Sequence, residues 1–187
     1  MIITISGTPG SGKSTIAKIL ERDLKAERIY VGQIMRENAR KQNKTLQQYI
    51  DEAQKNPSID KEIDNQVARL ALQKDERSNI IIVEGRIQFH LLHKSIKVFI
   101  TVSPEIGANR IYEDLKNNKT NTERNEGNPQ SIDQVLKATI KRMQEDKERL
   151  LKLYEVDYLN PKNYDLVIDT GSITAQEAAD QLKEYLA

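Results

Sequence analysis

Short runs of β-branched residues alternate along the chain with longer stretches in which apolar residues recur every three or four positions. This alternation predicts a parallel sheet flanked by helices, the α/β class. The predicted strands are 2–6, 27–31, 79–84, 96–102 and 164–168. The runs at 80–83 and 98–102 are almost continuously apolar, which is typical of strands covered on both faces, so we expect both near the centre of the sheet.

Helical periodicity fills the intervals between these strands. One amphipathic stretch spans 13–24, and 32–74 contains only helical segments, broken near Asn43 and Asn56, which predicts a helical insert. A helix from 103 to about 115 and a breaker-rich, mobile loop over 116–130 are expected next. Ser131 then caps a long helix whose apolar side is formed by Ile132, Leu136, Ile140, Met143, Leu150 and Tyr154. Thr174 to Glu177 forms a capping-box pattern that predicts a last helix ending at Tyr185.

Composition narrows the choice of partners. The 187 residues make about one domain, and 29 Lys and Arg against 28 Asp and Glu give a net charge of +1. This balance argues against a nucleic-acid polymer or a membrane surface as partner. The absence of cysteine excludes disulfides and thiolate chemistry, and two histidines are too few for most metal cages. Without a basic leader or an apolar run of about 18 residues, we expect a soluble, cytoplasmic protein.

Residues 7–14 form the strongest motif in the chain. They read Gly-Thr-Pro-Gly-Ser-Gly-Lys-Ser between a predicted strand and a predicted helix, the context that a phosphate loop requires. Glycines turn backbone amides inward and the helix N-terminus adds its dipole, while Lys13 reaches the β- and γ-phosphates and the Ser14 hydroxyl ligates Mg²⁺. The expected cofactors are ATP and Mg²⁺; the alternative is a Gly-rich turn with a solvated lysine. The residues assigned to nucleotide binding are those of this motif and the one that follows it: Gly7, Thr8, Pro9, Gly10, Ser11, Gly12, Lys13, Ser14 and Thr15.

Separated arginines indicate that phosphoryl groups are handled beside this loop. A guanine-specific switch protein is disfavoured, because neither 43–46 nor 118–121 completes an N-K-x-D element. The arginine fork suits phosphate oxygens, and several forks around a cleft accelerate phosphoryl transfer by positioning and charge. The candidates are Arg36, Arg86, Arg110, Arg124, Arg142 and Arg149.

Charged residues at a strand end and on two predicted helices extend the site. Ligands in open α/β sheets lie beyond the carboxyl ends of strands, so we expect Glu84 to hold Mg²⁺ or its water; pairing with its own neighbour is the alternative. Asp146 shares a helix face with Arg142 and Arg149, either as a solvated ion-pair ladder or as part of a lid closing over a phosphate. Asp60 and Asp64 also share a helix face, and Asp60 is placed to favour a helix N-terminus.

Taken in order, these motifs resemble the cytidylate kinases, in particular the short archaeal-type branch of the nucleoside monophosphate kinase family. The segments that carry the resemblance are the phosphate loop, 32–36, 56–64, 83–86, 142–149 and 164–170. The resemblance implies one domain over 1–187 with a five-stranded parallel sheet of order 2-3-1-4-5. It also implies a monophosphate-binding insert at 33–75 and a lid at 112–145.

Roles for individual residues follow from the same resemblance. Arg36 and Arg86 would grip the acceptor phosphate, and Arg142, Asp146 and Arg149 would line the closed site. Thr170, in a segment that lies against the adenine of ATP, and Arg110 are assigned to the ATP side. Two departures from the family are Val31, where many members have a small polar residue, and a lid loop that looks longer than usual.

The implied activity is ATP-dependent phosphorylation of CMP or dCMP by a monomer. With cytosine as the base, Asp60 and Asp64 would accept hydrogen bonds from its amino group, unless Asp60 merely favours the helix N-terminus. The alternatives are a kinase of the same fold acting on AMP, UMP or a non-nucleotide alcohol, and a regulatory protein that binds ATP without turnover. A monophosphate acceptor is mostly dianionic at neutral pH and needs no general base, so catalysis by positioning and electrostatics is expected. The absence of a catalytic histidine or cysteine constellation agrees with this expectation.

Overall fold

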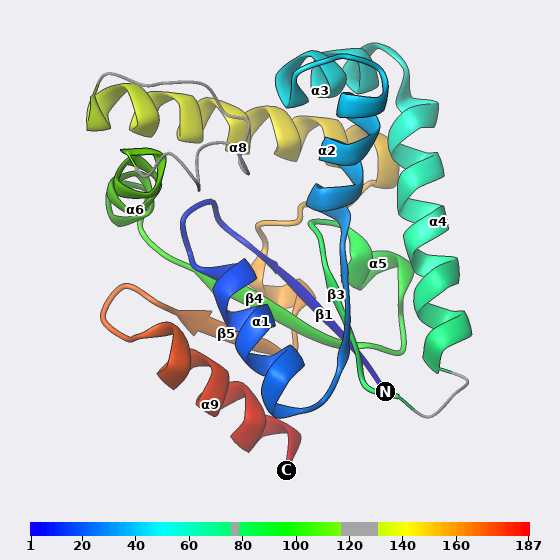
Figure 1. Ribbon diagram of the computed structural model, residues 1–187, viewed down its shortest axis with the longest axis vertical. Coiled ribbons are helices and arrows are strands. Elements are labelled where there is room, and N and C mark those ends of the chain that lie inside the picture. Colours follow the sequence, from blue (N-terminus) through cyan, green and yellow to red (C-terminus); the bar gives the residue numbers. More distant parts are fainter. Residues whose placement is uncertain (76–78, 117–130) are drawn as a thin grey trace.

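The computed structural model describes residues 1–75, 79–116 and 131–187. Its centre is one parallel sheet in the order β2-β3-β1-β4-β5, which confirms the predicted class and strand order (Figure 1). The strands are β1 (Ile2–Gly7), β2 (Glu27–Tyr30), β3 (Ile81–Glu84), β4 (Ile96–Thr101) and β5 (Leu166–Asp169). The central position of β1 places the loop that follows it in the middle of the carboxyl edge of the sheet.

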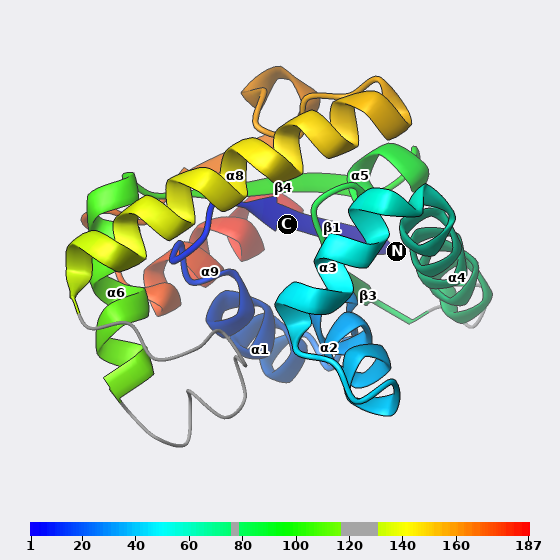
Figure 2. The ribbon, with the colours of Figure 1, turned by 90° about the horizontal axis from the view of Figure 1, so that it is seen from above.

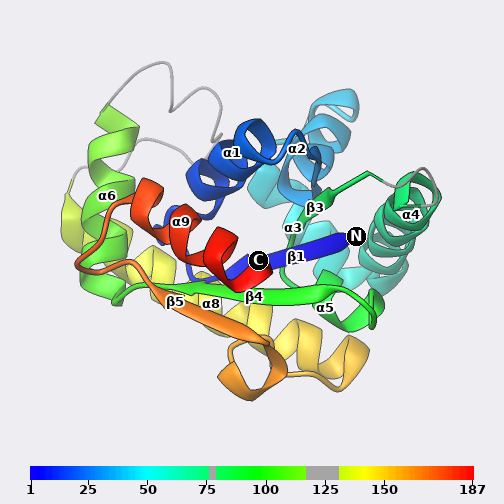
Figure 3. The same ribbon diagram turned by 90° about the horizontal axis from the view of Figure 1, so that it is seen from below.

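Two helices cover one face of this sheet, α1 (Lys13–Asp23) and α9 (Ala175–Leu186) (Figure 3). Alternate residues of a strand point to opposite faces, so Ile3 and Ile5 meet Leu20 and Leu182 in a fully buried cluster on this side. Thr174 and Glu177 form the predicted capping box at the start of α9. This rigid layer fixes the direction in which α1 leaves the phosphate loop.

The insert contains three helices, α2 (Val31–Lys41), α3 (Leu46–Lys55) and α4 (Pro57–Asp75). They pack through Ala39, Tyr49, Val67 and other buried residues against β2 and β3. The breaks between them fall near Asn43 and at Asn56, as predicted, and Thr45 closes a capping box at the start of α3.

Two further helices lie over the carboxyl edge, α6 (Pro104–Lys116) and α8 (Ile132–Tyr154). Figures 1 and 2 show α8 running across the molecule from α6 to the insert. The two helices share an apolar cluster that includes Ile111, Leu115 and Val135. As a result, α8 covers the region beyond the carboxyl ends of the strands.

The predicted apolar side of the long helix is wrong in part. Ile132 and Ile140 are 39% and 48% exposed. The residues of α8 that the structure buries are Val135, Thr139, Asp146 and Leu150. The inward face is displaced because it lines a polar cleft, so its buried residues include a carboxylate.

Several predicted boundaries also shift. Strand β2 ends before Val31, which opens α2, while β3 begins at Ile81 and β5 covers 166–169 instead of 164–168. Two short elements escaped prediction, α5 (Gln88–Leu91) and the 3₁₀ helix η1 (Pro161–Asn163), because one turn carries too few residues for a periodic pattern. Apart from Lys116, which ends α6, the predicted loop at 116–130 lies outside the described residues, and so does Arg124. Among the helices that the structure describes, none has an apolar stretch suited to crossing a membrane.

Candidate active site

The phosphate loop leaves β1 and turns directly into α1. Gly10 and Gly12 have φ angles of 73° and 83°, a left-handed conformation that side chains rarely adopt. A Cβ atom on Gly10 would lie 2.3 Å from the carbonyl oxygen of Gly107 in α6, and one on Gly107 would lie 2.6 Å from the carbonyl oxygen of Pro9. The loop therefore packs backbone against backbone on α6.

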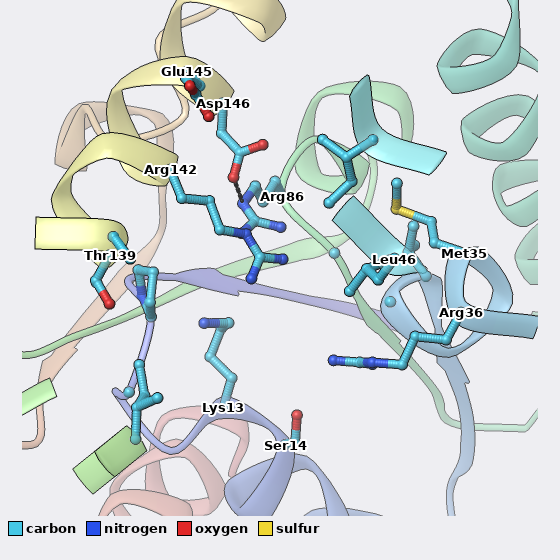
Figure 4. Close-up of a pocket in the computed structure, with 18 of the residues that line it drawn as sticks. Lys13, Ser14, Met35, Arg36, Leu46, Arg86, Thr139, Arg142, Glu145 and Asp146 are labelled. Carbon is cyan, nitrogen blue, oxygen red and sulfur yellow. Dashed lines mark ion pairs between the residues drawn. The ribbon is translucent and has the colours of Figure 1, made fainter. Parts of the chain in front are cut away.

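Hydrogen bonds hold the interior of this loop. Ser11 Oγ donates to the Thr8 carbonyl at 2.8 Å, and the Val102 amide donates to Thr8 Oγ1 at 3.1 Å. Lys13 Nζ donates to the same Thr8 carbonyl at 2.7 Å. Figure 4 shows the Lys13 side chain pointing into the cavity, towards the guanidinium groups of Arg86 and Arg142. The predicted phosphate-binding lysine is thus in place beside the loop.

Arg110 in α6 and Thr170, which follows β5, hold the phosphate loop through hydrogen bonds. Arg110 Nη2 donates to the Thr170 carbonyl at 2.7 Å, and its Nη1 lies 3.1 Å from Thr170 Oγ1 and 3.5 Å from the Gly10 carbonyl. Thr170 Oγ1 donates to the Ser11 carbonyl at 3.0 Å. Both residues therefore adjoin the nucleotide-binding loop, while direct contact of either with ATP stays a prediction.

Ser14 and Glu84, the two residues predicted to bind Mg²⁺, are hydrogen-bonded to each other. Ser14 Oγ donates a hydrogen bond to Glu84 Oε1, and Glu84 is only 2% exposed. A hydroxyl and a carboxylate are oxygen ligands of the kind that Mg²⁺ takes beside nucleotide phosphates, so this pair fits the ion. The other oxygen of Glu84 is bonded by Arg28 Nη2, whose side chain is 11% exposed. Glu84 therefore pairs across strands and not with its sequence neighbour.

Arg28 is a residue that the sequence did not reveal. It lies on β2 two residues before Tyr30, which is opposite Glu84 in the parallel register. A sequence shows that a charged residue interrupts a strand, but not which residue of the next strand it faces. The only available signal was an arginine inside a short predicted strand, between Glu27 and Ile29.

Asp146 lies at the centre of the arginine cluster. Arg149 Nη2 donates to Asp146 Oδ1 at 2.7 Å, and Arg86 Nε forms an ion pair with Asp146 Oδ2 at 2.9 Å (Figure 4). Burial alone would raise the pKa of the Asp146 carboxyl, but Arg86, Arg149 and Arg142 outweigh this effect and lower it. Asp146 therefore stays ionised and gathers three cations on one side of the cleft. The alternative of a solvated ladder is wrong, since the side chains of Asp146 and Arg149 are 5% and 12% exposed.

Asp60 and Asp64, the two carboxylates predicted to bind the cytosine base, are both buried and both accept hydrogen bonds. Asp60 accepts a hydrogen bond from Arg149, which joins α4 to α8. Asp64 accepts from Gln88 Nε2 and from the Tyr154 hydroxyl, each at 2.7 Å. Burial raises the pKa of Asp64 to about 6, against the opposing effect of the Tyr154 hydrogen bond. Asp60 lies in the first turn of α4, as predicted, but its ion pair shows that it does more than stabilise a helix terminus. Gln88 and Tyr154 were missed because their contacts join segments distant in sequence.

These groups surround one cavity of about 1050 Å³ between the phosphate loop, the insert, α6 and α8. Arg36 enters it from α2, opposite α8 (Figure 4). The predicted site residues that line it are Pro9, Gly10, Gly12, Lys13, Ser14, Thr15, Arg36, Asp60, Asp64, Glu84, Arg86, Arg110, Arg142, Asp146 and Arg149. Gly7, Thr8, Ser11 and Thr170 do not line it and support the loop from behind. The sheet order, the phosphate loop and the convergent arginines define the class of P-loop kinases.

Comparisons with known proteins narrow this class. The sequence profile of a family described as "AAA domain" matches residues 3–130. The chain is 36% identical over 188 residues to the cytidylate kinase of Sulfurisphaera tokodaii, covering all of this chain and 95% of that protein. It is 33% identical over 177 residues to that of Archaeoglobus fulgidus, covering 94% and 89%. The chain belongs to the archaeal-type cytidylate kinase branch of the P-loop nucleoside monophosphate kinase family.

Two other matches support less, because one covers only part of a longer protein and the other shares the fold at low sequence identity. An S-adenosylmethionine-dependent nucleotide dehydratase of Lacinutrix mariniflava is 32% identical over 184 residues, but this chain spans only 35% of its length. A crystal structure of shikimate kinase from Bacteroides thetaiotaomicron superposes with a TM-score of 0.61 at 16% identity, covering all of this chain and 98% of that one. That structure supports the fold alone.

Replacing Arg28 by Met should lower the free energy of unfolding by about 3–5 kcal/mol, because it leaves the buried charge of Glu84 without its partner. Urea denaturation followed by circular dichroism measures the change. Arg22→Met is the matched control, since that side chain is 69% exposed and its removal should leave the free energy of unfolding nearly unchanged. Equal effects of the two substitutions would show that the Arg28–Glu84 pair does not stabilise the strand ends.

Proposed function

We propose that this protein is a cytidylate kinase, which transfers the γ-phosphoryl group of ATP to CMP or dCMP and yields ADP and the nucleoside diphosphate. The observation that carries the proposal is the convergence of Lys13, Arg36, Arg86 and Arg142 on one cavity beside the phosphate loop. Its relatives named cytidylate kinase, at 36% and 33% identity over most of the chain, support the choice of acceptor.

On the donor side, the loop amides and Lys13 bind the phosphates of ATP, and Arg110 and Thr170 border the nucleotide. Ser14 and Glu84 hold Mg²⁺, whose charge offsets that of the phosphates during transfer. Arg28 keeps the Glu84 carboxylate turned towards Ser14. The positions of Lys13, Ser14 and Glu84 in the cavity support their roles, whereas the roles of Arg110 and Thr170 rest on the family resemblance.

On the acceptor side, Arg36 and Arg86 bind the monophosphate. Its second pKa is about 6, so the attacking oxygen is already deprotonated at neutral pH and no general base is needed. The remaining task is to hold two mutually repelling phosphates in line and dry, which arginine and lysine side chains accomplish by positioning and electrostatics. In this proposal 33–75 is the acceptor-binding insert and 112–145 the lid, whose closure brings Arg142 and Arg149 to the transferring group.

Base selection is assigned to the carboxylates on α4. Cytosine presents an amino group where uracil presents a carbonyl, so Asp60 and Asp64 favour cytosine by accepting a hydrogen bond. Each carboxylate has about four lone-pair positions, which leaves acceptor capacity on Asp64 beside its bonds to Gln88 and Tyr154. Keeping an acid buried with a raised pKa costs stability, and such groups cluster at functional sites.

The rival functions have less support. An alcohol acceptor, as in kinases of the shikimate type, needs a base for its hydroxyl proton, whereas a second arginine group suits an acceptor that carries phosphate. A regulatory protein that binds ATP without turnover does not account for Arg36 and Arg86 opposite the loop. The dehydratase match covers about a third of that protein and gives this chain no part in its chemistry. The proposed partners are the small-molecule substrates alone, with the protein as a monomer.

A coupled assay of ADP release tests the proposal with CMP, dCMP, UMP, AMP and GMP as acceptors. We expect release only in the presence of a monophosphate, with the highest kcat/KM for CMP or dCMP. Lys13→Ala should reduce turnover to background at an unchanged circular dichroism spectrum, because Lys13 contributes charge to phosphates and not packing. ADP release that is independent of every monophosphate, or that survives in Lys13→Ala, would refute the assignment.

The arginines should separate into two kinetic groups. Arg36→Ala and Arg86→Ala should raise KM for CMP at least tenfold, about 1.4 kcal/mol of binding. Arg142→Ala and Arg149→Ala should lower kcat by roughly 10³-fold, comparable with loss of an arginine finger. Steady-state kinetics at saturating CMP distinguish the groups, with Arg22→Ala as an exposed control. Values of kcat within about threefold of wild type for both α8 variants would exclude their role in the lid.

Asp64→Asn tests base selection. The amide replaces one carboxylate oxygen by a donor, so kcat/KM for CMP should fall about tenfold while the value for UMP changes less than threefold. Asp60→Asn is expected to act in the same direction, and Asp180→Asn on the exposed surface of α9 is the matched control. An unchanged CMP-to-UMP ratio in both α4 variants would show that these carboxylates do not select the base.

A further inference from the structure

Tyr30, the last residue of β2, lies beside two guanidinium groups. Its ring centroid is 5.0 Å from Arg28 Cζ and 5.6 Å from Arg36 Cζ, within the range of cation–π attraction. Its hydroxyl accepts a hydrogen bond from Arg36 Nη1 at 3.1 Å. Tyr30 also lines the cavity, on the side of the insert where Arg36 enters. Neither the phosphate loop nor the arginine pattern pointed to this residue.

The backbone at Gly32 lies against one side of the Tyr30 ring. A Cβ atom on Gly32 would lie 2.7 Å from Tyr30 Cε2 and 2.9 Å from both Cζ and the hydroxyl oxygen, so the ring packs on backbone that only glycine leaves open. Arg28, the other neighbour of the ring, is held in turn by the buried Glu84 carboxylate. Tyr30 is therefore a stiff support with two rotatable bonds, set on a strand of the sheet.

A support of this kind matters for a flexible phosphate ligand. An arginine side chain carries about 2 kcal/mol of rotamer entropy, and binding is weakened by whatever part of it is lost on ordering. Contact with the Tyr30 hydroxyl and ring orders Arg36 before a ligand arrives. The hydroxyl accepts a hydrogen bond from one of the five N–H donors of the guanidinium. The contact therefore orients the guanidinium and does not use its other N–H groups.

We propose that Tyr30 is a positioning residue for the acceptor phosphate, which acts by holding Arg36 in the orientation that binds a phosphate monoester. The inference rests on the proposed function, because it takes Arg36 to be a ligand of the acceptor. It adds a link from the acceptor side to the metal side of the cleft: Arg36 contacts Tyr30, Tyr30 contacts Arg28, and Arg28 holds Glu84.

Tyr30→Phe tests this inference, because it removes the hydroxyl and keeps the ring. We expect KM for CMP to rise about tenfold, the effect of losing a hydrogen bond to a charged group, with kcat and KM for ATP within about twofold of wild type. Isothermal titration of CMP without ATP should show a matching rise in Kd. Tyr30→Leu, which also removes the ring contacts, should weaken CMP binding further.

Tyr185→Phe is the matched control, since the same atom is removed from an exposed residue of α9. Thermal unfolding of each variant checks the fold, and Tyr30→Phe keeps the test decisive if Tyr30→Leu is unstable. An unchanged KM and Kd for CMP in Tyr30→Phe would overturn the positioning role while wild-type turnover upholds the kinase. A wild-type protein without monophosphate-dependent ADP release would overturn the proposed function, and this inference with it.

Discussion

The arrangement of the cleft depends on one buried negative charge. Asp146 forms ion pairs with Arg86 and Arg149 and faces Arg142. Three guanidinium groups at the edge of a cavity that also holds Lys13 would repel one another if nothing compensated them. The carboxylate allows the arginines to be assembled in advance, at a place where phosphate groups can later share their positive charge.

The same network joins α8 to α4 of the insert. Arg149 bridges α8 to Asp60 on α4, and Tyr154 repeats the connection one helical turn later through Asp64. Buried polar contacts of this kind are directional, so they define a relative orientation as well as an attraction. These contacts therefore fix the orientation of α8 relative to α4. The proposed reaction uses the same side chains.

Local patterns predicted the parallel sheet, the phosphate loop and the charged face of the long helix, and the family resemblance supplied the strand order. Contacts between distant segments could not be predicted from either. The phosphate loop and the spacing of Arg142, Asp146 and Arg149 are properties of a few consecutive turns, and they lie where the sequence indicated. Arg28 and Tyr30 depend on the register of β2 against β3, which no periodicity encodes. The inward face of α8 was misjudged at Ile132 and Ile140 because hydrophobicity identifies a buried face only when the interior is apolar.

The close contact between the phosphate loop and α6 changes what should be counted as part of the loop. Gly10 and Gly107 approach so closely that neither position has room for a methyl group, and Gly107 lies far along the chain in a different helix. A pattern written for consecutive residues cannot include it. The nucleotide-binding motif of this protein is therefore a discontinuous one, and a search of genomes for proteins that share its loop geometry would gain selectivity by requiring a glycine near the start of the helix after the fourth strand.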